Sequence, residues 1–329
     1  MTRAEFAILG AGAIGSILAA HLARSGRSVI VLARGNRARA VERDGLRIKG
    51  LADFSVKVSV LTDPTQLRAA DTLIVAIKTP GTDVALQRLK HAEVGAALSI
   101  QNGVLKNELL VQVFGPDRVL GALADTSGEL LPSGEVLFTR NVNLPLGELA
   151  GGSSERARRI AGMIDAAGIR SVAVPDILSL EWSKFTVWLA LVSMGVTTRS
   201  ATWRYLSDVD CAQVLVRLVC EVAALARAQG IALVDGATTL PLLEILDASE
   251  HAAVAAVRKA GADMRLRAPG HRISALQDLE AGRPLEVEET FGYAVRKARE
   301  HRLSLPLLEA FYHLVAGIDH ASRAAGNSP

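Results

Sequence analysis

Cysteine is scarce in this sequence, and both copies lie in one apolar helical stretch. Cys211 and Cys220 are the two cysteines among 329 residues. Nine residues along a helix separate the two thiols by about 13 Å, which is too far for a disulfide. Two cysteines also cannot supply the four ligands of a structural zinc site, so we predict no metal. This scarcity is typical of a reducing compartment, and we predict a cytoplasmic protein.

An excess of charge of one sign is also missing. The formal net charge is +3, and the arginines are scattered through helical stretches instead of forming a basic block. We therefore predict no nucleic-acid partner. The opening "MTRAEF" lacks the charged, apolar and small-residue regions of a signal peptide. The longest apolar run, residues 185–198, is shorter than the roughly 20 residues that cross a bilayer, so we predict a buried helix and no membrane partner.

The first part of the chain alternates strand and helix signals. The main strand candidates are "FAILGA", "SVIVLAR", "DTLIVAIK" and "AALSIQNG", and the shorter ones are "RVLGAL", "EVLFT", "NLPLGEL" and "SVAVP". Such alternation predicts an α/β domain, a doubly wound and mostly parallel sheet of the Rossmann type with helices on both faces.

After Pro175 the pattern becomes helical throughout. Helical periodicity covers residues 177–200, 207–230, 237–260, 272–281, 285–301 and 305–325. We predict two domains, a Rossmann domain at 1–177 that binds the cofactor and an all-helical domain at 178–329 for substrate and catalysis. The apolar helices of the second domain can pack within one chain or form the seam of a homodimer, and both arrangements stay open.

Three glycines between the first strand and the first helix form the pattern G-x-G-x-x-G. Gly10 permits a tight turn, Gly12 lets the backbone approach a pyrophosphate, and Gly15 allows close packing of helix on strand. The free N–H groups of the helix start then face the phosphates. We predict that these glycines, together with Ala13 and Ile14, bind a dinucleotide.

The end of the second strand indicates which dinucleotide. A carboxylate there would accept a hydrogen bond from a ribose 2′-hydroxyl, but this strand ends in "VLARGNR". Arg34 and Arg37 can instead pair with a 2′-phosphate, because a planar guanidinium offers two parallel donors. We therefore predict NADPH as the cofactor, with Arg37 alternatively a solvated helix residue.

Other polar groups fall at positions where ligands bind. Lys78 closes one strand and Asn102 follows the next, both at carboxyl ends of predicted parallel strands. Lys184 stands at the head of a very apolar helix, where partial desolvation would help it to donate a proton near neutral pH. Asp278 fits a helix face or cap, and Glu286, after "GRP", fits the start of another helix.

These pieces, in this order, resemble the ketopantoate reductase (2-dehydropantoate 2-reductase) family over nearly the whole chain. The most specific passages are "EWSK", "QNG" after a strand, "LPLGEL", and "HRISALQDLEAGRPLEVE". The resemblance implies an NADP-binding Rossmann domain, a helical second domain, and reduction of a small 2-keto acid in the cleft between them.

The resemblance also implies site roles. Lys184 resembles the lysine that protonates the keto oxygen, and Glu286 resembles the acid that anchors the active-site geometry. Asn102 resembles the asparagine at the junction of nicotinamide and substrate, Lys78 the lysine of that cleft, and Ser274 the hydroxyl that contacts the substrate carboxylate.

One departure from the family changes the expected substrate. The family commonly carries asparagines four and eight residues after the lysine, where this chain has Trp188 and Val192. Three hypotheses follow. The first is an NADPH-dependent reductase of a 2-keto acid that is more apolar than, or different from, ketopantoate. The second is a genuine 2-dehydropantoate 2-reductase of pantothenate biosynthesis, with Ser193, Thr197 or Thr198 supplying the substrate contacts. The third is a catalytically inactive dinucleotide-binding regulator.

Overall fold

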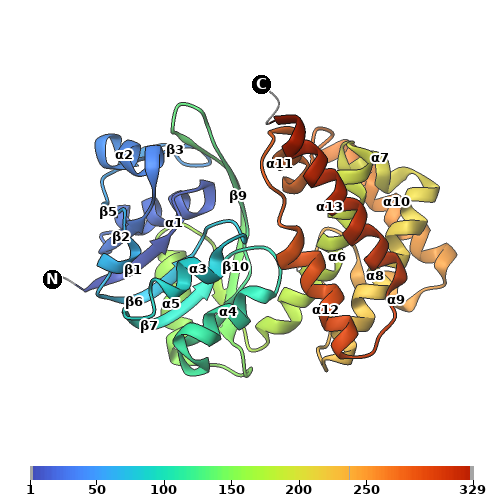
Figure 1. Ribbon diagram of the computed structural model, residues 1–329, viewed down its shortest axis with the longest axis horizontal. Helices are drawn as coiled ribbons and strands as arrows, with labels where there is room; N and C mark the ends of the chain where they lie inside the picture. The colour runs from blue at the N-terminus through green and yellow to red at the C-terminus, as the bar shows by residue number, and fades with distance from the viewer. Residues whose placement is uncertain (1–2, 237, 327–329) are drawn as a thin grey trace. The chain divides into compact units, whose positions relative to one another are not determined.

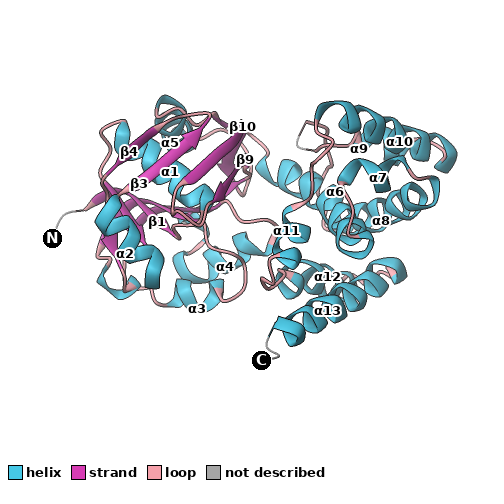
Figure 2. Cartoon of the chain, turned by 90° about the horizontal axis from the view of Figure 1, so that it is seen from above, coloured by secondary structure: helices cyan, strands magenta, loops and turns pink. Residues whose placement is uncertain are grey.

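The chain folds into two compact units, Met1–Leu178 and Ser179–Pro329. The structure is a computed structural model that describes residues 3–236 and 238–326 (Figure 1). Within these described ranges, all strands belong to the first unit, and the second unit consists of helices and their connections (Figure 2). The assignment of cofactor binding to the first unit and catalysis to the second stays a prediction.

The described part of the first unit is built on an eleven-stranded sheet. The strands are β1 (Ala4–Leu9), β2 (Val29–Leu32), β3 (Leu46–Gly50), β4 (Phe54–Val56), β5 (Ser59–Leu61), β6 (Ala69–Val75), β7 (Glu93–Ser99), β8 (Val119–Ala122), β9 (Asp125–Leu130), β10 (Val136–Glu148) and β11 (Ser171–Ala173). The order is β4-β3-β10-β8-β7-β6-β1-β2-β5, with β9 and β11 pairing with β10. The neighbouring strands β8, β7, β6, β1, β2 and β5 all run parallel to one another. The predicted doubly wound Rossmann sheet is therefore confirmed.

The strand order reverses beside β1. The chain runs outward from β1 to β2 and later returns to the other side of β1 as β6. In register, Leu9 at the end of β1 pairs with Leu32 of β2 and with Val75 of β6. The three strands therefore end level with one another, and the loops after them meet at the reversal point, where open α/β sheets bind ligands.

Helices cover both faces of this sheet because the β1 side chains alternate. Phe6 and Ile8 pack into the core formed with α1 (Ala13–Arg24), α2 (Gly35–Asp44) and α5 (Glu155–Ala166). Ala7 and Leu9 pack into the opposite core, formed with α3 (Thr82–Gln87) and α4 (Leu105–Phe114). Each large side chain buried in this way stabilises the fold by about 1.5–3 kcal/mol relative to exposure. Two short 3₁₀ turns, η1 (Pro64–Gln66) and η2 (Pro116–Arg118), complete the unit.

The second unit is helical, as predicted, but several helix boundaries differ from the prediction. The elements are α6 (Ile177–Thr198), α7 (Thr202–Ser207), α8 (Val209–Ala228), α9 (Leu242–Asp247), α10 (Glu250–Arg267), α11 (Ser274–Glu280), the π-helical turn η3 (Glu288–Gly292), α12 (Tyr293–Glu300) and α13 (Pro306–Gly326). The helix predicted at 237–260 is two helices, because Ser249 caps a new helix by accepting from the Ala252 N–H. The helix predicted at 285–301 begins with the π-helical turn.

Helix α6 is longer than the apolar run within it suggested. It has 22 residues and is long and apolar enough to cross a membrane by length and composition, so the prediction that the run was too short was wrong for the helix as a whole. Of its most apolar window, 78% is buried inside the fold, which is the burial of a core helix. On α8 both cysteines are free, in agreement with the absence of a disulfide.

Candidate active site

The glycine turn after β1 has the shape that a dinucleotide requires. Gly10 has φ +113°, and a Cβ there would lie 2.7 Å from Cγ2 of Ile77, just beyond the end of β6. A Cβ on Gly15 would lie 2.1 Å from the carbonyl oxygen of Gly10, so α1 packs directly on the turn. No atom of the described residues lies within 4 Å of a Cβ built on Gly12. Only the middle glycine therefore faces open space.

The start of α1 is suited to an anion. Gly12 is the N-cap and provides no side-chain hydrogen bond to the first turn of the helix. The first N–H groups of a helix, here at Ala13 and Ile14, carry partial positive charge and bind phosphate when no side chain caps them. The open space at Gly12 and the uncapped helix together fit the pyrophosphate of a nicotinamide dinucleotide.

The two arginines after β2 differ sharply in their surroundings. Arg34 is the N-cap residue of α2 and is exposed, and its guanidinium has no hydrogen-bond or ion-pair partner within the part of the chain that the structure describes. Arg37 is half-buried and donates from Nε to the Ala11 carbonyl at 2.8 Å, from Nη1 to the Gly134 carbonyl at 2.8 Å, and from Nη2 to Ser16 Oγ at 2.9 Å. Desolvation lowers the pKa of Arg37. Arg37 is therefore not the solvated helix residue of the alternative prediction. Its guanidinium forms three hydrogen bonds to the protein, one of them to the carbonyl of Ala11 in the glycine turn.

Lys78 and Asn102 both follow parallel strands, as predicted. Lys78 lies three residues after β6 and is exposed, and Asn102 lies three residues after β7 and is half-buried. Because β6 and β7 are paired in parallel register, the loops that carry the two residues begin at the same edge of the sheet. The Asn102 amide has no protein partner among the described residues, which leaves its donors and acceptor available to a ligand.

Lys106 is a residue that the sequence analysis missed. It is buried in the first turn of α4, and its Nζ donates to the carbonyl oxygens of Gln101 at 3.1 Å and Ala122 at 2.5 Å. These bonds connect the segment carrying Asn102 to the end of β8. A lysine four residues after the asparagine, within the apolar stretch "VLKNELLVQVF", was the available signal.

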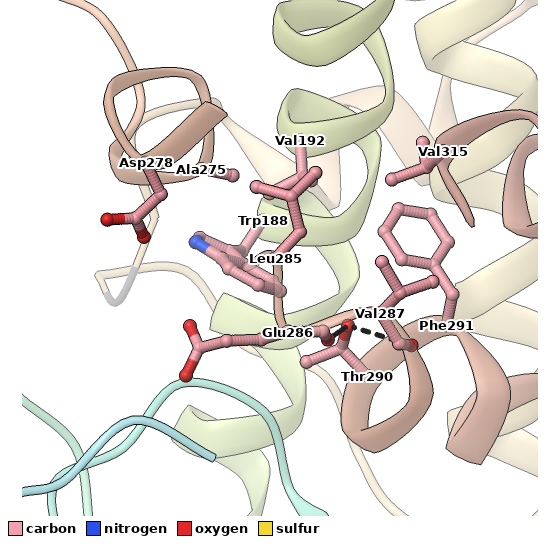
Figure 3. A pocket seen from close by; sticks show the side chains of 10 residues that line it. All are labelled: Trp188, Val192, Ala275, Asp278, Leu285, Glu286, Val287, Thr290, Phe291 and Val315. Atoms are coloured by element: carbon pink, nitrogen blue, oxygen red, sulfur yellow. Dashed lines mark hydrogen bonds between the residues drawn. The ribbon is translucent and has the colours of Figure 1, made fainter. Parts of the chain in front are cut away.

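The second unit contains a small cavity that is partly open to solvent, and the empty space in it and at its mouth together amounts to about 270 Å³. Side chains from α6, α11, the 285–291 segment and α13 line it (Figure 3). They are Trp188, Val192, Ala275, Asp278, Leu285, Glu286, Val287, Thr290, Phe291 and Val315. The wall is mainly apolar, with two carboxylates and one hydroxyl.

Of the five site residues predicted in this unit, three line the cavity and two do not. Trp188, Val192 and Glu286 are lining residues. Lys184 is half-buried one helical turn before Trp188, so it shares the α6 face that carries Trp188 and Val192. Ser274 is exposed at the first position of α11, next to the lining residue Ala275.

Glu286 reaches the cavity from an irregular segment. Its main chain is not helical: regular structure begins one residue later and passes directly into the π-helical turn 288–292, so the expectation that Glu286 starts a helix was off by one residue. Thr290 Oγ1 donates back to the carbonyl oxygen of Glu286 (Figure 3). Single π-helical turns are frequent at functional sites, because they change which side chains face one side of a helix.

Asp278 is part of the cavity wall rather than a solvated helix residue. It is buried, and its Oδ1 accepts from Arg283 Nε at 2.8 Å. Figure 3 shows its carboxylate and that of Glu286 on the same side of the cavity, the side on which the indole nitrogen of Trp188 also lies. The two carboxylates and the indole nitrogen are therefore grouped on one side, opposite the apolar side chains of Phe291 and Val315, while the Thr290 hydroxyl donates to the Glu286 carbonyl.

The hydroxyls considered as alternative substrate contacts are engaged within α6. Ser193 is fully buried and donates to the Leu189 carbonyl at 2.9 Å, one turn earlier. Thr197 and Thr198 likewise donate to carbonyls of the preceding turn. Such back-bonding satisfies the hydroxyl inside its own helix. The geometry gives the second hypothesis no support from these residues.

A Rossmann sheet with a glycine turn at its reversal point, followed by a helical unit with a lined cavity, is the architecture of a nucleotide-dependent oxidoreductase. Residues 6–151 match the family model described as "Ketopantoate reductase PanE/ApbA", and residues 176–319 match its C-terminal counterpart. The chain belongs to the ketopantoate reductase family, as the sequence analysis predicted. It is an oxidoreductase of an enzymatic family.

Individual relatives agree with this assignment. A "2-dehydropantoate 2-reductase" of Archaeoglobus fulgidus is 29% identical over 312 residues, covering 95% of this chain and 97% of the relative. The crystal structure of a PanE/ApbA family ketopantoate reductase from Ralstonia eutropha JMP134 superposes with a TM-score of 0.82 at 25% identity, covering 97% and 99% of the two chains. D-mandelate dehydrogenase, solved with NADH and anilino(oxo)acetate, shares the fold at 17% identity, with a TM-score of 0.81 and coverage of 96% and 99%.

Proposed function

We propose that this chain is an NADPH-dependent reductase of a 2-keto acid whose side chain is more apolar than, or different from, that of ketopantoate. The observation that carries the proposal is the cavity wall of the second unit, where Trp188 and Val192 occupy the α6 face that begins with Lys184. Family membership supports the reaction class.

The cofactor part of the proposal rests on the first unit. Gly10, Gly12 and Gly15 would cradle the pyrophosphate, with the N–H groups of Ala13 and Ile14 as donors. Arg34, exposed and unpaired within the described residues, would pair with a 2′-phosphate. A bound nicotinamide dinucleotide would supply the hydride that reduces the keto group.

Lys184 is the proposed proton donor. Reduction of a keto group leaves a negative charge on its oxygen, which a nearby ammonium stabilises and then neutralises by giving up a proton. The amide of Asn102 would orient the carbonyl, and Lys78 and Ser274 would bind the substrate carboxylate. Glu286 would hold the geometry of the site from the cavity wall, and its own carboxylate keeps a second anion away from that side.

The substrate part of the proposal follows from the chemistry of the wall. An indole and an isopropyl group offer apolar contact where two amides would offer hydrogen bonds, and each substrate CH₂ buried against them stabilises the complex by about 0.8 kcal/mol. A hydroxyl of the substrate placed against Val192 and the carbon face of the indole, away from the indole N–H and the two carboxylates, loses its water without gaining a partner. A branched or aryl side chain therefore fits this cavity better than a hydroxylated one.

Turnover measurements test the proposal directly. With NADPH as cofactor, kcat/KM is measured for ketopantoate and for 2-keto acids with branched and aryl side chains. We expect at least one of the bulkier acids to exceed ketopantoate by about tenfold or more. A clear preference for ketopantoate would instead establish the second candidate, a 2-dehydropantoate 2-reductase, which the names of the curated relatives favour.

Replacement of Lys184 by alanine tests the proton donor. Loss of a general acid is expected to lower kcat by about 10²–10⁴-fold while NADPH binding is retained. Turnover that survives the replacement would remove Lys184 from the mechanism. A wild-type protein that binds NADPH but reduces none of the acids would leave the third hypothesis, a dinucleotide-binding regulator, in place.

A further inference from the structure

A buried carboxylate on the last helix holds the segment that carries Glu286. Asp319 of α13 is 2% exposed. Its Oδ1 accepts from the backbone N–H of Leu285 at 2.9 Å, and its Oδ2 accepts from Arg323, one turn later on the same helix. Burying a carboxylate costs free energy that hydrogen-bond donors must offset, and here the Leu285 N–H and the Arg323 guanidinium each donate to one of its oxygens.

The segment that Asp319 holds is irregular, and at its start the Arg283 N–H donates to the Asp278 carbonyl oxygen at 2.8 Å. Residues 283–286 follow the turn at Gly282 and belong to neither a helix nor a strand. The backbone of this segment is fixed at two points on either side of the Glu286 Cα atom: the Leu285 N–H by Asp319 and the Glu286 carbonyl by Thr290 Oγ1. Both Leu285 and Glu286 line the cavity. The two anchors thus decide where the Glu286 side chain leaves the main chain.

The same face of α13 also forms part of the cavity. Val315 lies one helical turn before Asp319 and is a lining residue, beside Phe291 in Figure 3. An apolar contact such as Val315 against Phe291 can slide, because dispersion is not directional. A charge-assisted hydrogen bond has a preferred length and angle. Tyr312 of α13 also donates to Glu288 Oε1 at 2.9 Å, but that bond ends on an exposed side chain, whereas the bond from the Leu285 N–H to Asp319 holds the backbone next to Glu286.

We propose that Asp319 is a positioning residue for Glu286: it acts through the Leu285 N–H and touches neither substrate nor cofactor. This inference rests on the proposed function for the catalytic meaning of Glu286. It makes a kinetic prediction, because a displacement of about 1 Å in a catalytic group lowers the rate by about 10²-fold.

Three variants separate the contributions of the bond, the charge and the fold. Asp319→Leu removes the acceptor, and Asp319→Asn keeps an oxygen at the same place without the charge. Arg323→Gln is the matched control, because this arginine is exposed and its loss leaves the bond from Asp319 to Leu285 in place.

Hydrogen exchange of the Leu285 amide and steady-state kinetics are measured for each variant. For D319L we expect amide exchange to be faster by about tenfold or more, kcat to fall by about tenfold or more, and KM to stay within about threefold. D319N should keep the amide protected and kcat within about threefold, and R323Q should match the wild type within about twofold.

A double-mutant cycle with Glu286→Gln distinguishes positioning from a general structural role. If Asp319 acts through Glu286, D319L should lower kcat by less than about twofold in the E286Q background. An equal loss in both backgrounds, or accelerated exchange with unchanged kcat, would overturn the proposal. Should D319L not fold, D319N decides the matter, because a tenfold loss of kcat with a protected Leu285 amide would also overturn it. If the wild type reduced no keto acid, the proposed function would fail, while the exchange data would still show whether Asp319 anchors Leu285.

Discussion

Replacing Gly12 by alanine should weaken cofactor binding without disturbing the fold. A methyl group on Gly12 meets no described atom within 4 Å apart from those of its immediate chain neighbours, and the φ of −68° suits alanine. The methyl would instead occupy the space that the pyrophosphate needs and would lengthen its hydrogen bonds to the start of α1. Charge-assisted hydrogen bonds contribute about 1.5–3 kcal/mol each, so loss of one raises the Kd for NADPH by about 10- to 100-fold.

Gly15 provides the opposite case in the same turn. A Cβ on Gly15 would stand 2.1 Å from the Gly10 carbonyl oxygen, whereas real Cβ contacts essentially never fall below 3.0 Å. The helix and the turn must therefore separate by about 0.9 Å, and overpacking of this kind costs about 1–3 kcal/mol of the free energy of unfolding. Gly15→Ala should lower stability first and cofactor affinity as a consequence.

Two assays on purified variants separate these effects. Titration of NADPH fluorescence gives Kd, and chemical denaturation gives the free energy of unfolding. Gly162→Ala, in the exposed middle of α5 with nothing near its Cβ, is the control; it should leave Kd unchanged and stabilise by about 0.5–1 kcal/mol. Wild-type affinity in Gly12→Ala, or wild-type stability in Gly15→Ala, would refute the proposed role of the turn.

Further predictions concern the arginines, the cavity wall and pH. Arg34→Gln should lower the preference for NADPH over NADH by about tenfold or more with unchanged stability, whereas Arg37→Gln should lose about 1–3 kcal/mol of stability; a reversed pattern would contradict the assignment. Trp188→Asn should shift kcat/KM toward ketopantoate by about tenfold, and an unchanged ranking of substrates would remove Trp188 from specificity. Burial lowers the pKa of His21, so the unfolded chain binds more protons and the free energy of unfolding should fall as pH drops below about 6.5. That slope should shrink in His21→Gln and persist in His91→Gln.

Both the long and the short apolar runs predicted strands that the structure contains, whereas strands with a weak apolar signal were not predicted. Runs such as "DTLIVAIK" became central parallel strands because buried strands need continuous apolar sequence. Strands β3, β4, β5 and β9 were not predicted. Two of these four, β4 and β5, have three residues each, all exposed or half-buried, and β9 has one buried residue, Thr126, among its six. Their pairing to neighbouring strands, not their own composition, makes them strands.

Within the candidate site, the sequence predicted those features that depend on the local backbone conformation or on the spacing of residues along one helix. The glycine spacing predicted the turn after β1, and the spacing from Lys184 to Trp188 and Val192 predicted one face of α6. The family resemblance supplied Glu286. The sequence could single out Lys106 by its place in an apolar stretch, but nothing in "VLKNELL" indicates that its ammonium binds the carbonyls of Gln101 and Ala122.

By itself, the sequence determined the class of this protein: a parallel sheet with a glycine turn, followed by helices with a lysine on one apolar face. These features depend on contacts within one turn or one strand, and such contacts are encoded by neighbouring residues. Only the tertiary structure decided that Arg37 braces the turn while Arg34 stays exposed, and that Asp319 reaches Leu285 across 34 residues. Packing determines which donors and acceptors are buried together, and therefore which distant residues become hydrogen-bond partners.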